Sequence, residues 1–99
     1  MAVSKIFNNG FIINKLQYVD DLDDAKPIHS NNALQAYGYF NTAANRPSTS
    51  GGTVFVITGS DGSKYTQIAF TNSSAGPRID ARNYGTSGLT AWVNIIAPS

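Results

Sequence analysis

The sequence predicts a mainly β protein, namely a small antiparallel β-sheet or sandwich domain with at most one short helix. Residues 53–58 and 64–70 are two runs rich in β-branched and aromatic side chains, which is the composition of strands. Between them lies a polar turn in which Asp61 and Gly62 suit the positive φ angles of a tight hairpin. Asn, Ser, Thr and Gly together supply 37 of the 99 residues and Glu is absent, so few residues that favour helix surfaces remain.

The chain begins with apolar residues on both sides of the pair Asn9-Gly10, within residues 1–19. Asn-Gly favours a tight turn, so this segment is predicted to form two short strands. Its apolar residues cluster too closely for a single exposed hairpin. They pack either against a neighbouring chain or domain or against the chain's own sheet, and the sequence leaves both alternatives open.

Four of the six carboxylates of the chain gather at residues 20–24, around Leu22. Asp side chains accept hydrogen bonds from backbone N–H groups at the start of a helix, so we predict a capped turn or short helix anchored by Leu22. A calcium site is the alternative. Calcium takes oxygen ligands at set intervals, usually around a Gly-enforced bend, and this run has no Gly and no further acidic residue nearby. We therefore expect no metal site here.

The middle of the chain predicts one strand followed by a long loop. Residues 36–40 have the composition of a strand that Gly38 interrupts. Residues 41–52 are rich in turn formers and have no apolar anchor after Ala44. This composition predicts an exposed loop that is able to take part in recognition, with Arg46 near its centre.

A second hairpin is predicted near the end of the chain, from residues 78–84 and 89–96 around a Gly-rich turn at 85–88. Within its first strand, three charged residues at a spacing of two share one face. This spacing predicts ion pairing along the strand, and a polar strip that binds a ligand is the alternative. The three residues are Arg78, Asp80 and Arg82.

The apolar core is predicted to take its members from the strands with the strongest composition. In so short a chain, these β-branched and aromatic residues have few other apolar partners. For the single Trp, one possibility is burial with the indole N–H bonded to the backbone, and the other is an exposed ring that stacks on a ligand. The predicted core residues are Val54, Val56, Ile68 and Trp92.

Charge and composition argue against several classes of function. Seven basic residues stand against six Asp, for a net charge of +1, and they form no cluster, so we expect neither nucleic acid nor an anionic membrane as a partner. There is no cysteine and one histidine, His29, which disfavours a metal site. No apolar run reaches the roughly 20 residues of a membrane span, and residues 1–10 lack the pattern of a signal peptide.

The candidate catalytic residues form no recognisable constellation. His29 has no nucleophile elbow to serve, Asp61 is explained by its turn, and Asp80 has no obvious second carboxylate at a fixed spacing. The sequence also lacks a phosphate-cradling loop and a dinucleotide fingerprint. We therefore expect no enzyme activity and no cofactor.

Several short motifs follow one another along the second half of the chain. A Gly-Gly pair at 51–52 precedes a strand, and a Gly-rich turn and the run TQIA at 66–69 follow. Then come the Arg-bearing segment 78–84, another Gly-rich turn, and the run TAW at 90–92. In this order and spacing the motifs resemble the pyocin-knob domains of phage tail fibres, tailspikes and R-type pyocin fibres. The sequence departs from that family at 89–92, where Trp-Ser-x-Trp is common and one of the two aromatic residues is absent here.

The resemblance covers residues 22–96 and also implies a division of the chain. The acidic run around Leu22 is similar to the segment that often opens the knob module. On this basis residues 1–21 are an N-terminal strand and connecting segment with interdomain or intersubunit packing, and residues 22–99 are a knob-like β domain.

The resemblance implies a non-catalytic structural and receptor-binding module of a phage or phage-like tail fibre or tailspike. Such a module assembles as a homotrimer with other fibre and tail proteins, contributes to recognition of a bacterial surface polysaccharide, either lipopolysaccharide or capsule, and is part of the virion after synthesis in the host cytoplasm. A spacer that positions an adhesin or depolymerase without binding receptor is one alternative. A free-standing lectin-like or bacteriocin-associated domain is the other.

Carbohydrate binding is predicted on a polar strip at the end of the strand 78–84. Sugars bind to aromatic rings through their C–H patches and to amide, hydroxyl or guanidinium groups through their hydroxyls, and Tyr65 and Trp92 supply further rings of this kind. The strip ends at a Gly-rich turn, where side chains meet solvent, and the loop residues 45–50 are expected to assist. The predicted site residues are Arg82, Asn83, Tyr84 and Arg46.

Overall fold

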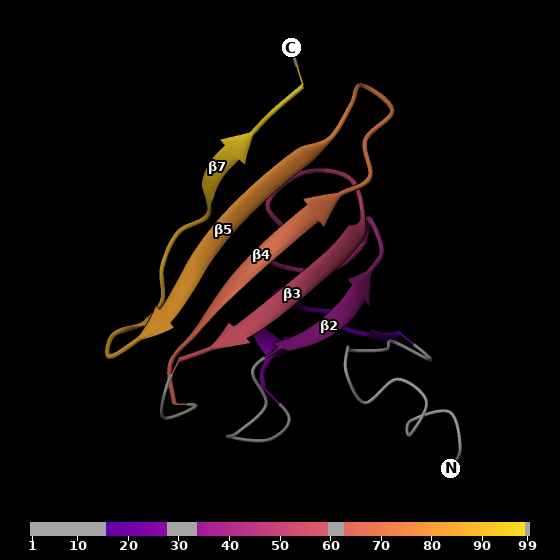
Figure 1. Cartoon of the computed structure of the whole chain (residues 1–99). Helices are drawn as coiled ribbons and strands as arrows, with labels where there is room; N and C mark the ends of the chain where they lie inside the picture. Colours follow the sequence, from indigo (N-terminus) through magenta and orange to yellow (C-terminus); the bar gives the residue numbers. More distant parts are fainter. Residues whose placement is uncertain (1–15, 28–33, 60–62, 99) are drawn as a thin grey trace, which may run out of the picture.

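The computed structural model describes residues 16–27, 34–59 and 63–98. These residues form one seven-stranded sheet and one short 3₁₀ helix, and they contain no α-helix, so the predicted mainly β fold with at most one short helix is confirmed (Figure 1). The elements are β1 (Gln17–Tyr18), η1 (Leu22–Asp24), β2 (Leu34–Tyr39), β3 (Gly52–Thr58), β4 (Tyr65–Thr71), β5 (Arg78–Gly85), β6 (Gly88–Leu89) and β7 (Val93–Ile96).

The strands lie in the order β1-β2-β3-β4-β5-β6, and β7 pairs with β5 further along the same edge (Figure 1). Neighbouring strands are antiparallel except β1 and β2, which run parallel. Parallel neighbours need a crossover between them, and here the chain makes it through η1. Within the described ranges the strands therefore form a single sheet that is antiparallel except for its β1–β2 pair.

The first predicted hairpin is confirmed by the pairing of β3 with β4. Their antiparallel register extends from Gly52 opposite Thr71 to Thr58 opposite Tyr65. Both strands are rich in β-branched and aromatic residues, which suit the pleated surface of a sheet. The predicted turn residues Asp61 and Gly62 lie outside the described residues.

The second predicted hairpin is confirmed at its turn, where Gly85 pairs with Gly88, but its returning strand is divided. Two residues of β5 lie between Ala81 and Tyr84, whereas three residues lie between their partners Val93 and Leu89. The extra residue shifts the register by one position between β6 and β7. An added residue of this kind changes the direction of the side chains next to it. Trp92 lies in this segment between β6 and β7, and its side chain packs against the core.

One face of the sheet, which we name the core face, carries the buried residues. Val54 and Val56 on β3 are both 0% exposed, as predicted, and Leu22 of η1 packs on them in the same cluster. The prediction for Ile68 is wrong. On β4 it is Gln67 that faces the core while Ile68 is half-buried on the opposite face, because side chains alternate along a strand. The remaining buried members of the cluster are Ala25, Tyr37, Tyr39, Ala43, Tyr65 and Ala69, with Val19, Leu89 and Trp92 packed against them.

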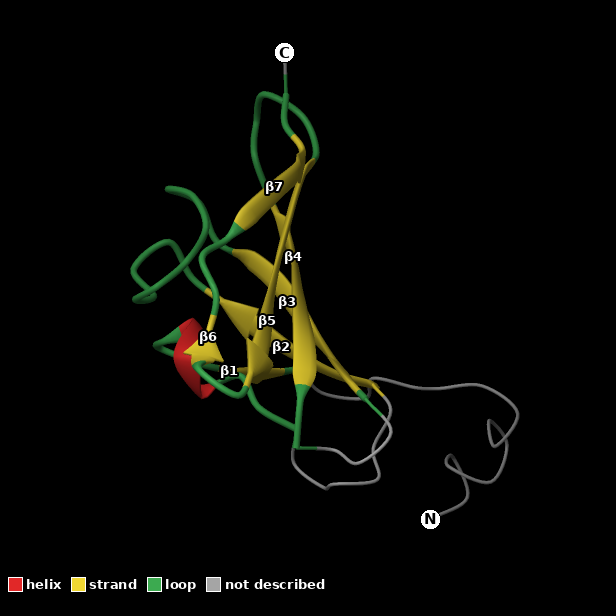
Figure 2. Ribbon diagram, turned by 90° about the vertical axis from the view of Figure 1, so that its left-hand side faces the viewer, coloured by secondary structure: helices red, strands yellow, loops and turns green. Residues whose placement is uncertain are grey.

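The loop between β2 and β3 and η1 lie on the core side of the sheet (Figure 2). The opposite side, which we name the open face, is formed by the alternate residues of β2, β3, β4, β5 and β7. At its β1 edge the rings of Tyr18 and Phe40 stack with centroids 4.8 Å apart. Gly38 was predicted to interrupt this strand, but β2 continues through it. A Cβ at Gly38 would lie 2.6 Å from the Tyr18 ring, so the absence of a side chain makes room for this ring.

The segment before β2 joins the same sheet. β1 pairs with β2, and Asp21 forms a bridge with Ala44. The Asp21 side chain accepts a hydrogen bond of 2.9 Å from the Asp23 N–H and caps η1, so the predicted capped turn is confirmed. The strands predicted around Asn9-Gly10 lie outside the described residues, and so does His29.

Gly51 and Gly52 lie where two neighbouring backbones come close to the start of β3. A Cβ built on Gly52 would lie 2.9 Å from the Cα of Thr71 and closer still to the carbonyl oxygen of Phe70. We expect Gly52→Ala to lower the unfolding free energy by about 2 kcal/mol, since two strands of the sheet must move apart. Urea denaturation followed by circular dichroism measures this loss.

The matched control for this prediction is Gly85→Ala, because no atom lies within 4 Å of a Cβ built on Gly85 and its φ is not positive. This variant should change the unfolding free energy by less than about 0.5 kcal/mol. Equal losses in the two variants would contradict the role of close backbone approach at Gly52.

Candidate binding surface

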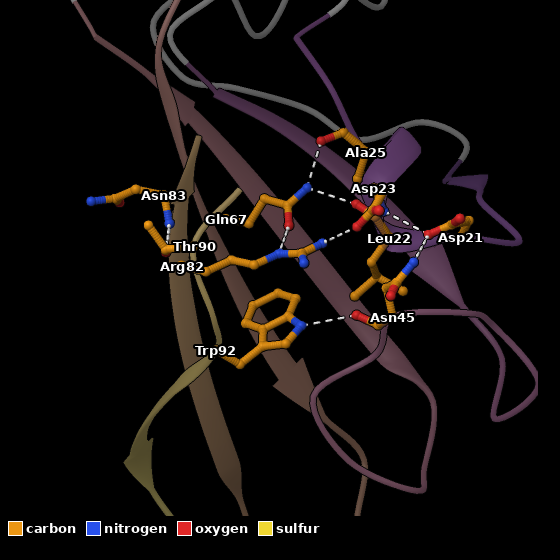
Figure 3. A network of polar contacts seen from close by, with 10 residues as sticks. All are labelled: Asp21, Leu22, Asp23, Ala25, Asn45, Gln67, Arg82, Asn83, Thr90 and Trp92. Atoms are coloured by element: carbon orange, nitrogen blue, oxygen red, sulfur yellow. Dashed lines mark hydrogen bonds and ion pairs between the residues drawn. The ribbon is translucent and has the colours of Figure 1, made fainter. Parts of the chain in front are cut away.

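A buried polar cluster lies at the centre of the core face (Figure 3). Gln67 on β4 is 0% exposed. Its Nε2 donates to the carbonyl oxygens of Leu22 at 2.7 Å and Ala25 at 2.8 Å, and its Oε1 accepts from Nε of Arg82 at 2.7 Å. Carbonyl groups at the end of a helix lack partners further along it, so the bond to Ala25 completes the end of η1, and the two bonds together fasten η1 to the sheet.

Arg82 on β5 belongs to this cluster and not to the surface. It is 8% exposed, and its Nη2 donates to Oδ1 of Asp23 at 3.0 Å. The guanidinium carbon also lies 4.3 Å from the centroid of the Trp92 ring, within the range of a cation–π contact. The expectation that Arg82 presents its guanidinium on an exposed strip is therefore corrected, because a buried charge needs these partners.

Trp92 connects the end of the chain to the loop between β2 and β3. Its Nε1–H donates to the carbonyl oxygen of Asn45 at 2.9 Å, so the predicted bond from the indole to the backbone is confirmed, although the ring is half-buried. Asn45 has a positive φ of 58° and donates from Nδ2 to Oδ1 of Asp21 at 2.8 Å. This bond, and next the bond from the Asp23 N–H, lower the pKa of Asp21 below its ordinary value.

The loop between β2 and β3 folds over the core face instead of extending into solvent throughout. Ala43 is buried in the core cluster, and the chain turns back so that Nη1 of Arg46 donates to the Ala43 carbonyl oxygen at 2.6 Å. The Nε atom of Arg46 is buried and has no protein partner. Arg46 is thus half-buried and supports the loop with part of its guanidinium.

A second polar cluster lies further along β5. Arg78 makes two hydrogen bonds to the carboxylate of Asp80, at 2.9 and 3.2 Å, and Asp80 is 2% exposed. Asn94 of β7 donates from Nδ2 to the same carboxylate at 3.2 Å. The predicted ion pairing along β5 is confirmed for Arg78 and Asp80, whereas Arg82 pairs with Asp23.

Two of the four predicted site residues, Asn83 and Tyr84, line an open hollow of about 320 Å³ at the end of β5. Tyr84 is 38% exposed, and its ring stacks on that of Tyr65 with centroids 5.0 Å apart and planes within 10°. The hollow therefore combines an exposed aromatic face with amide, hydroxyl and ammonium groups. Its remaining lining residues are Ile57, Thr58, Gly59, Lys64, Tyr65, Thr66 and Gly85.

Hydrogen bonds and burial within the sheet fix the positions of Asn83 and Tyr65, which line this hollow. Asn83 accepts on Oδ1 from Oγ1 of Thr66 at 2.9 Å, and its backbone N–H donates to Oγ1 of Thr90 at 3.0 Å. Tyr65 is 7% exposed, and burial, followed by its neighbour Tyr84, raises the pKa of its hydroxyl. The Tyr84 ring thus stacks on the ring of Tyr65, which is buried and uncharged.

Two further hollows lie elsewhere on the sheet. One of about 440 Å³ lies beside the Tyr18–Phe40 pair and includes Asn41, Ser50 and Asn72 in its lining. The other, of about 550 Å³, lies at the turn between β4 and β5 and is lined in part by Phe70 and Arg78. None of the four predicted site residues lines either of them.

Three of the acidic residues that the sequence offered for catalysis or metal binding are engaged in structural bonds. Asp21 accepts from Asn45, Asp23 from Arg82, and Asp80 from Arg78. In the described part of the chain no three His, Cys, Asp or Glu residues gather as a metal site would require. No helix among these residues is long and apolar enough to cross a membrane.

Sequence reasoning did not predict that Gln67 is buried, and it therefore missed the polar cluster in which Arg82 is buried as well. A signal for it was present: Gln67 lies between Tyr65 and Ala69 at a spacing of two, so it shares their face of the strand. A polar residue on a buried face needs hydrogen-bond partners, and Arg82 is directly opposite in the register.

No protein-family model, curated protein or solved structure matches this chain. The likeness to pyocin-knob domains therefore rests on the order of motifs in the sequence.

Proposed function

We propose that this chain is a non-catalytic structural and receptor-binding module of a phage or phage-like tail fibre or tailspike. It contributes to recognition of a bacterial surface polysaccharide, either lipopolysaccharide or capsule, and works in the virion as a homotrimer beside other fibre and tail proteins. The order of motifs along residues 22–96 supports the type of module, and the hollow at Tyr84 supports the glycan.

The observation that supports glycan binding is the Tyr84 ring in the lining of the hollow of about 320 Å³. A sugar ring stacks its C–H face on an aromatic ring, and its hydroxyls take hydrogen bonds from nearby polar groups. Tyr84 offers the ring at 38% exposure, while Asn83 and Thr66 offer amide and hydroxyl groups in the same lining. Lys64 adds a cation that suits the acidic sugars and phosphates of such polysaccharides.

The affinity of one such hollow is modest. The lining is open and its polar groups exchange bonds with water, so we expect a dissociation constant near millimolar, about −4 kcal/mol. Three copies on one fibre raise the avidity, because the second and third contacts become intramolecular.

A spacer that positions an adhesin or depolymerase is the second candidate. The observation that favours it is the burial of Arg82, whose guanidinium is bound by Gln67 and Asp23 and is closed to a ligand. The recognition surface is then smaller than the sequence predicted, and the polar clusters of the core face give the module rigidity.

The test is adsorption of the fluorescently labelled full chain to a panel of bacterial strains, before and after periodate treatment of the cells, which cleaves sugar diols. We expect binding to a subset of strains and its loss after periodate. Tyr84→Ala should weaken binding about tenfold, the effect of about 1.4 kcal/mol. The matched control is Tyr18→Ala, since Tyr18 is also an exposed residue in a stacked aromatic pair.

Binding that survives periodate would exclude a glycan with oxidisable diols as the receptor. Equal losses in Tyr84→Ala and Tyr18→Ala, with both variants folded, would remove the site from the hollow at Tyr84. Absence of binding to every strain in the panel would replace the receptor-binding proposal with the spacer.

A further inference from the structure

The open face carries three rows of side chains that run across the sheet, as the strand registers define them. The middle row crosses the sheet through Phe55, Ile68 and Val93. The rings of Phe55 and Phe70 meet edge to face with centroids 5.5 Å apart. The outer rows are Leu34, Ile57, Thr66 and Asn83 on one side, and Gly38, Thr53, Phe70, Ile79 and Ile96 on the other, while Ala36 and Ala81 complete the middle row.

Large apolar side chains of this face remain in contact with solvent. Their exposed fractions are 38% for Leu34, 40% for Ile57 and for Phe70, 59% for Val93 and 47% for Ile96. Together these five side chains form a patch comparable to the largest apolar patch of a typical monomer, about 300–600 Å², and a patch of this size is often functional. Figure 2 shows that η1 and the loop between β2 and β3 lie on the other side of the sheet.

None of the strand residues on the open face is charged, and this property selects among partners. A charged protein surface or an anionic lipid headgroup finds no complementary charge there. A glycan finds few polar groups, since Thr53, Thr66 and Asn83 lie toward the margins and Thr66 already bonds Asn83. An identical uncharged face meets this face without any like-charge contact.

We propose that the open face is the surface through which copies of this chain associate, each directing it toward a common axis, where it packs against the open faces of the other copies. The apolar centre around Phe55, Ile68 and Phe70 becomes the dry core of that interface, and the hydroxyl and amide groups of Thr53, Thr66 and Asn83 form its rim. This arrangement has the anatomy of an association surface, apolar at the centre and polar at the margin. It also gives the single sheet the second layer that packed domains require.

The inference rests on the homotrimer in the proposed function and is independent of glycan binding. It names the face that the copies share. The core face and the Tyr84 ring stay on the outside of the assembly, while Thr66 and Asn83 lie at the rim, where the hollow borders the interface. Sheets that pack face to face lie about 10 Å apart, so a charge placed on this face is taken out of water in the assembly.

The experiment is sedimentation velocity on the full chain at micromolar concentration, compared with variants that each place one charge on the open face. Wild type should sediment as a multiple of the 10.6 kDa chain. Phe70→Lys and, at the other side of the face, Val93→Lys should each raise the dissociation constant of the assembly more than about tenfold, since an unpaired charge is buried on association. Both positions are solvent-exposed in the single chain, so the variants should keep its circular dichroism spectrum.

The matched control is Thr49→Lys, which places the same charge on an exposed loop position away from this face and should leave the mass of the assembly unchanged. A wild-type assembly that both open-face variants retain at unchanged affinity would overturn the inference while leaving the trimer in place. A monomeric wild type would overturn both. In that case reaction of a Phe70→Cys variant with a thiol reagent, in a chain that has no other cysteine, reports whether another part of the chain covers the face.

Discussion

The Gln67→Leu variant is expected to lose about 3–5 kcal/mol of unfolding free energy, because the substitution leaves buried polar groups without partners. The carbonyl of Ala25 and the Nε–H of Arg82 lose their bonds to the amide, while the Leu22 carbonyl keeps a bond of 3.2 Å from the Ala25 N–H. Leu has nearly the volume of Gln, so the loss reports hydrogen bonding and not a cavity. Urea denaturation at fixed protein concentration measures it.

The control for this variant is Gln17→Leu, the same substitution at an exposed position of β1. It should change the unfolding free energy by no more than about 0.5 kcal/mol. A loss below about 1 kcal/mol in Gln67→Leu would mean that the amide does not hold η1 to the sheet.

The Trp92→Ala variant is expected to lose about 2–3 kcal/mol, less than the 3–5 kcal/mol of a fully buried aromatic residue, because the ring is half-buried. The variant removes the contact with Arg82 and the bond to the Asn45 carbonyl together. Loosening of the loop around Asn45 should follow, with faster proteolysis there. Thermal unfolding followed by circular dichroism gives the stability of each variant.

Trp92→Phe separates the two contributions of this side chain. It keeps an aromatic ring and removes the indole N–H, so it should lose about 1 kcal/mol, the net value of one hydrogen bond. A loss below about 1 kcal/mol for Trp92→Ala would contradict the packing of the ring over Arg82 and favour a ring that is free to stack on a ligand.

The two polar clusters give the core face an unusual composition for so small a sheet. Gln67, Asp80 and Arg82 are buried there beside Val54 and Val56. Each polar group has partners, and this satisfies the requirement on buried polar atoms. Because these bonds are directional, they fix where η1 and the loop before β3 lie, whereas apolar contacts alone allow sliding.

Local sequence determined the strands and the first hairpin of this protein. Three features depend only on residues close by in the sequence. They are the β-branched and aromatic runs of β3 and β4, the turn around Gly85 and Gly88, and the cap that the Asp21 carboxylate gives to η1. Propensity, turn chemistry and helix capping are properties of short segments. These features could therefore be read from the chain without knowledge of its distant contacts.

The tertiary structure alone decided which face of each strand is buried. Gln67 bonds the Leu22 and Ala25 carbonyls across 45 and 42 positions, and Arg82 pairs with Asp23 across 59. Adjacent strand residues point to opposite faces, so the choice between Gln67 and Ile68 depends on which face such distant segments cover. Alternation places Gln67 on the same face as Tyr65 and Ala69 but does not say which face is covered, and for that reason the sequence placed Ile68 in the core and Arg82 on the surface.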